Sequence, residues 1–188
     1  MESPVLHALV DEFRRTKRLA EGAFDQLADE DFFFRLSPRQ NNVYAIVKHL
    51  SGNMVSRWTD FLTTDGEKPD RDRESEFVEA VVPREAILRT WETGWASVFA
   101  ALEPLTDADV SRTVTIRGEP HTVVQAAVRQ VAHYAYHVGQ ILLIAKHVRG
   151  ERWNHLTIPP GGTELFNRAI AGRGAKGATP GATPGGSA

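Results

Sequence analysis

Two histidines lie four positions apart in the stretch VAHYAYHVGQ, residues 131–140. If this stretch is helical, His133 and His137 share one face, and their rings can converge on a single ion. A third histidine, His49, occurs in the stretch IVKHLSGN. Neutral imidazole is a common ligand of divalent transition metals. The three residues are therefore candidate metal ligands.

All three histidines are expected at the margin of an apolar helical stripe. On a wheel of about 100° per residue, His133 and His137 lie beside the stripe of their helix, and His49 lies well off the stripe of its own. A bundle that packs these margins together would form a site with three nitrogen ligands. Three protein ligands leave one coordination position free, an arrangement typical of catalytic rather than structural zinc.

Two amides accompany these histidines at one-turn spacing. Gln130 comes one turn before His133, and Asn53 comes one turn after His49. Either amide could orient a ligand imidazole or a metal-bound water. Either could equally be an ordinary polar side chain at the edge of a bundle, and the sequence leaves both interpretations open.

Several other kinds of site fit this pattern less well. Histidine pairs at this spacing also occur in ordinary surface or core packing, so the spacing alone does not establish a ligand pair. The run HYAYH lacks the glutamate of the peptidase motif HExxH, and neither histidine has a glutamate three residues before it, as a di-iron bundle requires. No GxSxG motif is present for a serine hydrolase. Among the other histidines, His121 is the reserve candidate.

Composition narrows the possible function classes. A chain of 188 residues with 41% hydrophobic content is expected to form one domain with a proper core. The 22 basic and 24 acidic side chains give a net charge of −2, which predicts no broad surface for nucleic acid or anionic lipid. Without a leader-like or membrane-spanning stretch, we expect a cytoplasmic protein acting on a small molecule. The chain has no cysteine, so any sulfur chemistry needs a thiol from a substrate.

The elements that must position the histidines are mainly helical. The sequence predicts an all-α four-helix bundle, with a short hairpin around Arg117 and Gly118 between the third and fourth helices. Ser3 with Pro4, and the capping-box pattern of Ser37 to Gln40, mark the first two helix starts. The helices are expected at about residues 3–27, 37–63, 83–103 and 122–148.

The C-terminal part divides into two segments. We expect a bundle domain at 1–171 and a disordered tail at 172–188, because the tail consists largely of Gly, Ala, Pro and Thr and offers little to bury. The segment ERWNHLTIPPGGTELFN, residues 151–167, could fold back to line a mouth near the metal. It could equally be a packing segment in which Trp153, Leu156 and Phe166 cover the end of the bundle.

The chain resembles the DinB/YfiT-like superfamily over roughly residues 5–168. The resemblance is carried by IVKHLSGN, by HYAYHVGQI and by LTIPPGGTELFN. It implies a four-helix bundle, often dimeric, that binds a divalent metal through three histidines. Matched by motif, those ligands are His49, His133 and His137. Zinc and nickel are the metals we expect first.

The resemblance also implies several functions. Some relatives are transferases that join a low-molecular-weight thiol, such as bacillithiol or mycothiol, to an electrophile. We therefore expect a metal-dependent thiol transferase in which the metal binds the cofactor's sulfur and lowers its pKa. Metal-dependent hydrolysis and a noncatalytic, stress-related metal-binding bundle remain alternatives. A homodimer is also expected.

Overall fold

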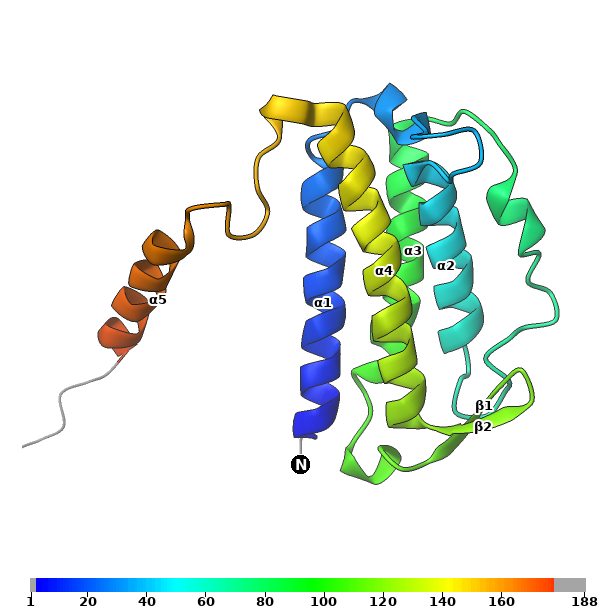
Figure 1. Ribbon diagram of the computed structural model, residues 1–188. Helices are drawn as coiled ribbons and strands as arrows, with labels where there is room; N and C mark the ends of the chain where they lie inside the picture. The colour runs from blue at the N-terminus through cyan, green and yellow to red at the C-terminus, as the bar shows by residue number, and fades with distance from the viewer. Residues whose placement is uncertain (1–2, 178–188) are drawn as a thin grey trace, which may run out of the picture. The chain divides into compact units, whose positions relative to one another are not determined.

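The computed structural model describes residues 3–177 and confirms the predicted four-helix bundle (Figure 1). A two-stranded antiparallel hairpin precedes the last helix of the bundle, as expected. None of the described helices is both long and apolar enough to cross a membrane. The elements of the bundle are α1 (Pro4–Phe24), α2 (Val43–Trp58), α3 (Arg84–Leu102), β1 (Thr113–Ile116), β2 (Glu119–Thr122) and α4 (Val123–Arg149).

Three of the four helix starts agree with the prediction, and a side-chain cap marks two of them. The Ser3 side chain caps α1, with Pro4 in the first turn, and α3 begins directly after Pro83. Thr122 and Gln125 form a reciprocal capping box at the start of α4, with bonds of 2.8 and 3.1 Å. These signals are local, which explains why the sequence located them.

The predicted start of α2 at Ser37 to Gln40 is wrong. The Ser37 carbonyl accepts a hydrogen bond from the Gln40 backbone in a turn, and the helix begins only after Asn42. Asn42 accepts from the Ala45 backbone N–H at 2.8 Å and donates to the Phe33 carbonyl at 3.4 Å. This second bond ties Asn42 to the preceding segment, so residues 37–40 form a turn and the helix starts only at Val43.

The far end of α2 also lies earlier than predicted. The helix stops at Trp58, and Asp60 adopts a left-handed backbone conformation with φ 49°. The backbone N–H groups of Thr63 and Thr64 then donate to the Asp60 carbonyl, both at 3.0 Å. A residue with positive φ reverses the chain direction, so the apolar residues after Trp58 do not continue the helix.

The four helices run up, down, down and up (Figure 1). Arg84, at the start of α3, donates to the carbonyls of Phe24 and Leu27 at the end of α1. Asn42, at the start of α2, bonds to the Phe33 carbonyl in the segment that follows α1, so α2 begins at the same end of the bundle. Helices α2 and α3 are therefore parallel neighbours, and the connection between them, residues 59–83, must return along the length of the bundle.

The bundle core is aromatic and holds α2 against α4. The rings of Phe13, Trp58, Trp95 and Tyr134 pack around one another at centroid distances of 5.7 to 6.2 Å. The Trp58 indole N–H donates to the buried Tyr134 hydroxyl at 3.0 Å. This contact fixes the two helices that carry the three histidines. Trp58 and Trp95 therefore serve as core residues.

Helices α2 and α3 approach each other most closely at Gly94. A Cβ at this position would lie 2.8 Å from the Ser51 Cα and 2.9 Å from the Met54 sulfur. Only glycine leaves room for this backbone approach, which sets the spacing of the parallel pair.

The chain divides into two compact units, Met1–Trp153 and Asn154–Ala188, and the bundle belongs to the first. The second unit contains α5 (Thr163–Gly177), a helix that the sequence did not predict. This helix runs into the segment 172–188 that was expected to form a tail. The remaining tail residues, 178–188, lie outside the described residues, and a role of residues 151–167 near the metal stays a prediction.

Candidate metal centre

The structure brings the three predicted histidines together. One ring nitrogen from each of His49, His133 and His137 lies within 4.8 Å of the others. The ring centroids are 4.9 to 5.5 Å apart. Tetrahedral ligands around zinc lie roughly 3.4 Å from one another, so small rotations of the rings would complete the coordination geometry. His49 and His137 are buried, and His133 is half-buried.

His49 is oriented by a buried carboxylate that the sequence analysis missed. Its Nδ1 lies 2.8 Å from Glu76 Oε2, which leaves Nε2 as the ligand atom. Arg71 donates to the same carboxylate through Nε at 2.8 Å and through a terminal nitrogen at 3.0 Å. Carboxylate–histidine pairs of this kind set the ring tautomer and raise the basicity of a metal ligand.

A glycine on α2 makes this contact possible. Gly52 lies under the Glu76 side chain, and a Cβ at this position would overlap Glu76 Oε1 and lie 2.9 Å from Cδ. Glu76 belongs to the short 3-10 helix Glu74–Phe77 on the long connection between α2 and α3. The return path of this connection therefore brings an acid onto a histidine 27 positions earlier in the chain.

The other two imidazoles have different surroundings. His133 Nδ1 lies 3.3 Å from Gln130 Oε1, so the amide can accept its N–H and direct Nε2 toward the cluster. His137 Nδ1 is buried and has no hydrogen-bond partner among the described residues. The same holds for Oδ1 of Asn53, which lies on the wall of the adjacent cavity. Unpartnered buried polar atoms beside three imidazoles fit a site that holds an ion and its water.

Burial keeps the two α4 imidazoles neutral. Desolvation, followed by the charges of His137 and His49, lowers the pKa of His133 to about 3. Desolvation and His49 likewise lower the pKa of His137 to about 4. Burial opposes ionisation of Glu76, but hydrogen bonds from His49 and Arg71 outweigh it and lower the pKa of this carboxyl group. At neutral pH His133 and His137 are therefore neutral and Glu76 is a carboxylate, the protonation states that binding of a divalent metal requires.

These pKa shifts predict an acid-sensitive fold in the metal-free protein. In the unfolded chain each imidazole takes up a proton near pH 6.5, whereas in the folded chain the pKa values of His133 and His137 lie near 3 and 4. Folding stability is therefore complete above pH 6.5 and falls as the pH decreases toward 4. We expect the Tm of chelator-treated protein to fall by roughly 5 °C or more between pH 7 and pH 4.5.

A double variant isolates the contribution of these two imidazoles. His133→Gln/His137→Gln should lose most of the acid-dependent drop over this window, since glutamine does not titrate. Glu76 contributes little to the change in stability between pH 7 and pH 4.5. Its pKa is lowered in the folded protein, so the stability that it provides is lost only below about pH 4.5. Thermal melts of both proteins across the range make the comparison. An equal drop in the double variant would show that other groups cause it.

A cavity of 370 Å³ opens beside the cluster. His49, His133, Asn53, Gln130 and Tyr136 form part of its wall, together with five arginine side chains. The volume is sufficient for a small organic molecule. Two of the three candidate ligands therefore face a space that a substrate can occupy.

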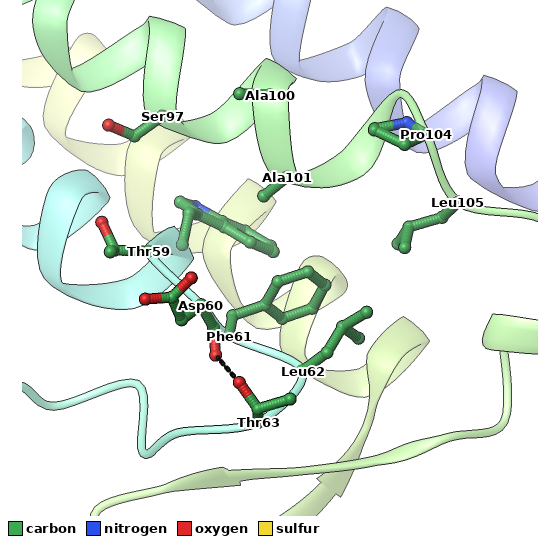
Figure 2. A pocket seen from close by; sticks show the side chains of 11 residues that line it. Thr59, Asp60, Phe61, Leu62, Thr63, Ser97, Ala100, Ala101, Pro104 and Leu105 are labelled. Atoms are coloured by element: carbon green, nitrogen blue, oxygen red, sulfur yellow. Dashed lines mark hydrogen bonds between the residues drawn. The ribbon is translucent and has the colours of Figure 1, made fainter.

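A larger cavity of 590 Å³ lies elsewhere, and no histidine lines it. Figure 2 shows that Phe61, Leu62, Pro104 and Leu105 give it a mostly apolar wall, with Asp60 and Thr63 joined by a hydrogen bond of 3.1 Å. Asp60 is its only ionisable lining residue. The cavity of 370 Å³, which two of the clustered histidines line, is therefore the candidate substrate site.

The reserve candidate His121 does not join the cluster. It lies on β2, and its Nδ1 contacts the Glu119 carbonyl at 3.0 Å. His7 pairs with Asp11 on the surface of α1, and the His147 ring stacks on Phe34. The residues that sequence reasoning missed are Glu76, Arg71 and the cavity arginines. Whether it lies in a loop or on a helix, a charged side chain carries no local signal of distant partners, so the sequence could not have identified them.

Comparison with known proteins shows one family-level match. A model of a family of proteins of unknown function covers residues 1–162, which include the bundle, the hairpin and all three clustered histidines. No curated protein matches the chain.

Proposed function

The chain belongs to the DUF1572 family, and we propose that it is a DinB/YfiT-like metalloenzyme that joins a low-molecular-weight thiol to an electrophile. The observation that carries this proposal is the convergence of His49, His133 and His137 beside an open cavity. Three imidazoles leave at least one coordination position for a substrate atom. The resemblance noted above points to a thiol of the bacillithiol or mycothiol type.

The donor set fits a borderline transition metal. Neutral imidazoles suit zinc and nickel, whereas calcium and magnesium prefer oxygen ligands. When bound, such a metal supplies Lewis acidity that favours the deprotonated form of a thiol or a water molecule. Zinc or nickel remains our first choice of metal.

The chain's own residues hold the ligands and admit the reactants. Glu76 and Arg71 orient the His49 ring, and Gln130 orients the His133 ring. The cavity brings a small molecule against His49 and His133. Because the chain has no cysteine, the nucleophilic sulfur must come from a second substrate. In the reaction the thiol releases its proton to solvent, and the sulfur bonds to the electrophilic carbon as the bond from that carbon to the leaving group breaks.

A thiol-dependence assay tests this function. Metal-loaded protein is incubated with a chromogenic aryl chloride and with bacillithiol, mycothiol or no thiol, and chloride release is followed. We expect release that depends on the thiol and is lost in His49→Ala but retained in the matched control His121→Ala. Turnover of a water-labile ester without any thiol would support the hydrolase alternative instead. Equal rates in His49→Ala and wild type would refute the metal-dependent mechanism.

We also propose that the protein forms a homodimer through α4. Val128 and Leu143 on this helix are 53% and 58% exposed. Between them the exposed positions Ala132, Ala135 and Gly139 continue the same stripe at helical spacing. An apolar stripe of small side chains suits close packing against a second helix. Light scattering should give twice the chain mass of 20.8 kDa, and a monomer mass would exclude the dimer.

A further inference from the structure

The cavity beside the histidine cluster is strongly basic, although the chain as a whole carries a net charge of −2. Five arginines contribute to its wall: Arg57, Arg71, Arg73, Arg117 and Arg129. They come from α2, from the connection after it, from the hairpin turn and from α4. Four separate parts of the chain therefore deliver guanidinium groups to one space.

Arg57 is a buried member of this set with incomplete hydrogen bonding. Its side chain is buried, and its Nε and one terminal nitrogen have no hydrogen-bond partner among the described residues. Its nearest carboxylate is Glu67, at 3.6 Å. Gly66 leaves the space that this side chain occupies, since a Cβ there would lie 2.8 Å from Arg57 Nη1. A buried guanidinium without full hydrogen bonding is costly unless it serves a ligand.

Arg117 reaches the cavity from a strained turn. It has φ 54°, a conformation that favours glycine, and the following residue Gly118 also has positive φ. The Asp65 carboxylate holds this turn by accepting from the backbone N–H groups of Arg117 and Gly118, both at 2.8 Å. The strain is thus maintained by a contact that places Arg117 at the cavity.

The carboxylates around the cavity do not balance its positive charge. Glu67 lies within 3.6 Å of Arg57, Arg71 and Arg117. Glu76 pairs with Arg71, and the exposed Glu74 pairs with Arg73. Arg129 forms no ion pair with any residue that the structure describes. Five guanidinium groups thus face three ion-paired carboxylates and the Asp65 carboxylate at the hairpin turn, and the histidines add no negative charge.

We propose that this cavity binds an oxyanion, a carboxylate or phosphate group carried by one of the two substrates, with Arg57 as its buried anchor. The proposal rests on the proposed function, because it names the substrate class of the same site. Guanidinium groups bind both oxyanions through paired N–H donors, and the surplus positive charge compensates the ligand's charge. Arg129 and Arg117 approach the group from the rim, and the histidine cluster lies beside it.

Calorimetric titration of the full-length protein tests this proposal. The probes are inorganic phosphate and succinate at constant ionic strength, with the protein either stripped of metal by a chelator or reloaded with zinc. We expect at least one probe to bind with and without metal. Arg57→Gln should weaken that binding by at least about tenfold and Arg129→Gln by about fivefold. Arg89→Gln, at an exposed position of α3 outside the cavity, should leave it unchanged.

The outcomes separate this proposal from the proposed function. Arginine-dependent binding in the stripped protein supports the anion site even if no thiol transfer is found. The preferred probe then shows whether the group is a phosphate or a carboxylate. Absence of binding by both probes, or equal affinity in wild type and both cavity variants, overturns the proposal even if transfer is found. Because Arg129 is exposed, its variant remains informative if Arg57→Gln does not fold.

Discussion

Replacement of His137 by alanine is expected to abolish stoichiometric metal binding while the bundle stays folded. His137 supplies one of only three clustered imidazoles, so its loss leaves two protein ligands. Loss of a residue that merely orients a ligand typically weakens metal binding by roughly 10- to 100-fold, and loss of a ligand itself should exceed that range. Elemental analysis of untagged protein and competition with a fluorescent chelator provide the measurements.

The matched control for this prediction is His121→Ala. His121 lies on β2 outside the cluster, so its removal should leave the metal content near that of the wild type. Circular dichroism confirms that both variants keep their helices. One metal ion per chain in purified His137→Ala, bound as tightly as in wild type, would rule out the three-histidine site.

Replacement of Glu76 by alanine is expected to weaken metal binding by about 10- to 100-fold and to destabilise the fold by about 3–5 kcal/mol. The first effect arises because His49 Nδ1 loses its carboxylate partner. The second arises because the buried Arg71 guanidinium keeps only Glu67, at 3.6 Å. Metal titration and urea unfolding measure the two effects separately.

Two further variants separate the effect of Glu76 on metal binding from its effect on stability. Glu76→Gln keeps an oxygen acceptor for His49 but removes the charge that pairs with Arg71, so it should recover more of the metal affinity than of the stability. Glu74→Ala removes an exposed carboxylate from the same short helix and should change neither quantity. If Glu74→Ala and Glu76→Ala have the same effects, the contacts of Glu76 with His49 and Arg71 are not their cause.

Local signals in the sequence predicted most helices and all three candidate ligands. Apolar periodicity identified the bundle, and the Ser3–Pro4 pattern located the start of α1 to within a residue. The wheel positions of His49, His133 and His137 indicated that their margins could meet, and the structure brings them within 4.8 Å. Such inferences succeed because one helical turn fixes the relative direction of side chains three and four positions apart.

The start of α2 and the helix α5 show where local signals fail. Two candidate caps precede α2, one at Ser37 to Gln40 and one at Asn42. The helix uses Asn42, whose side chain also donates a tertiary hydrogen bond to the Phe33 carbonyl. The Gly-rich composition after residue 171 predicted no helix, yet α5 continues to Gly177. Propensity is a weak constraint compared with contacts that the sequence does not display.

By itself, the sequence determined the helical class, the hairpin at Arg117 and Gly118, and which histidines could act as ligands. Only the tertiary structure decided that α2 and α3 run parallel, and that the returning connection places Glu76, which Arg71 holds, against His49. It also decided that arginines from four parts of the chain meet in one cavity. The physical reason is that periodicity encodes direction within an element, whereas contacts across 27 or more positions depend on the path of the chain between elements.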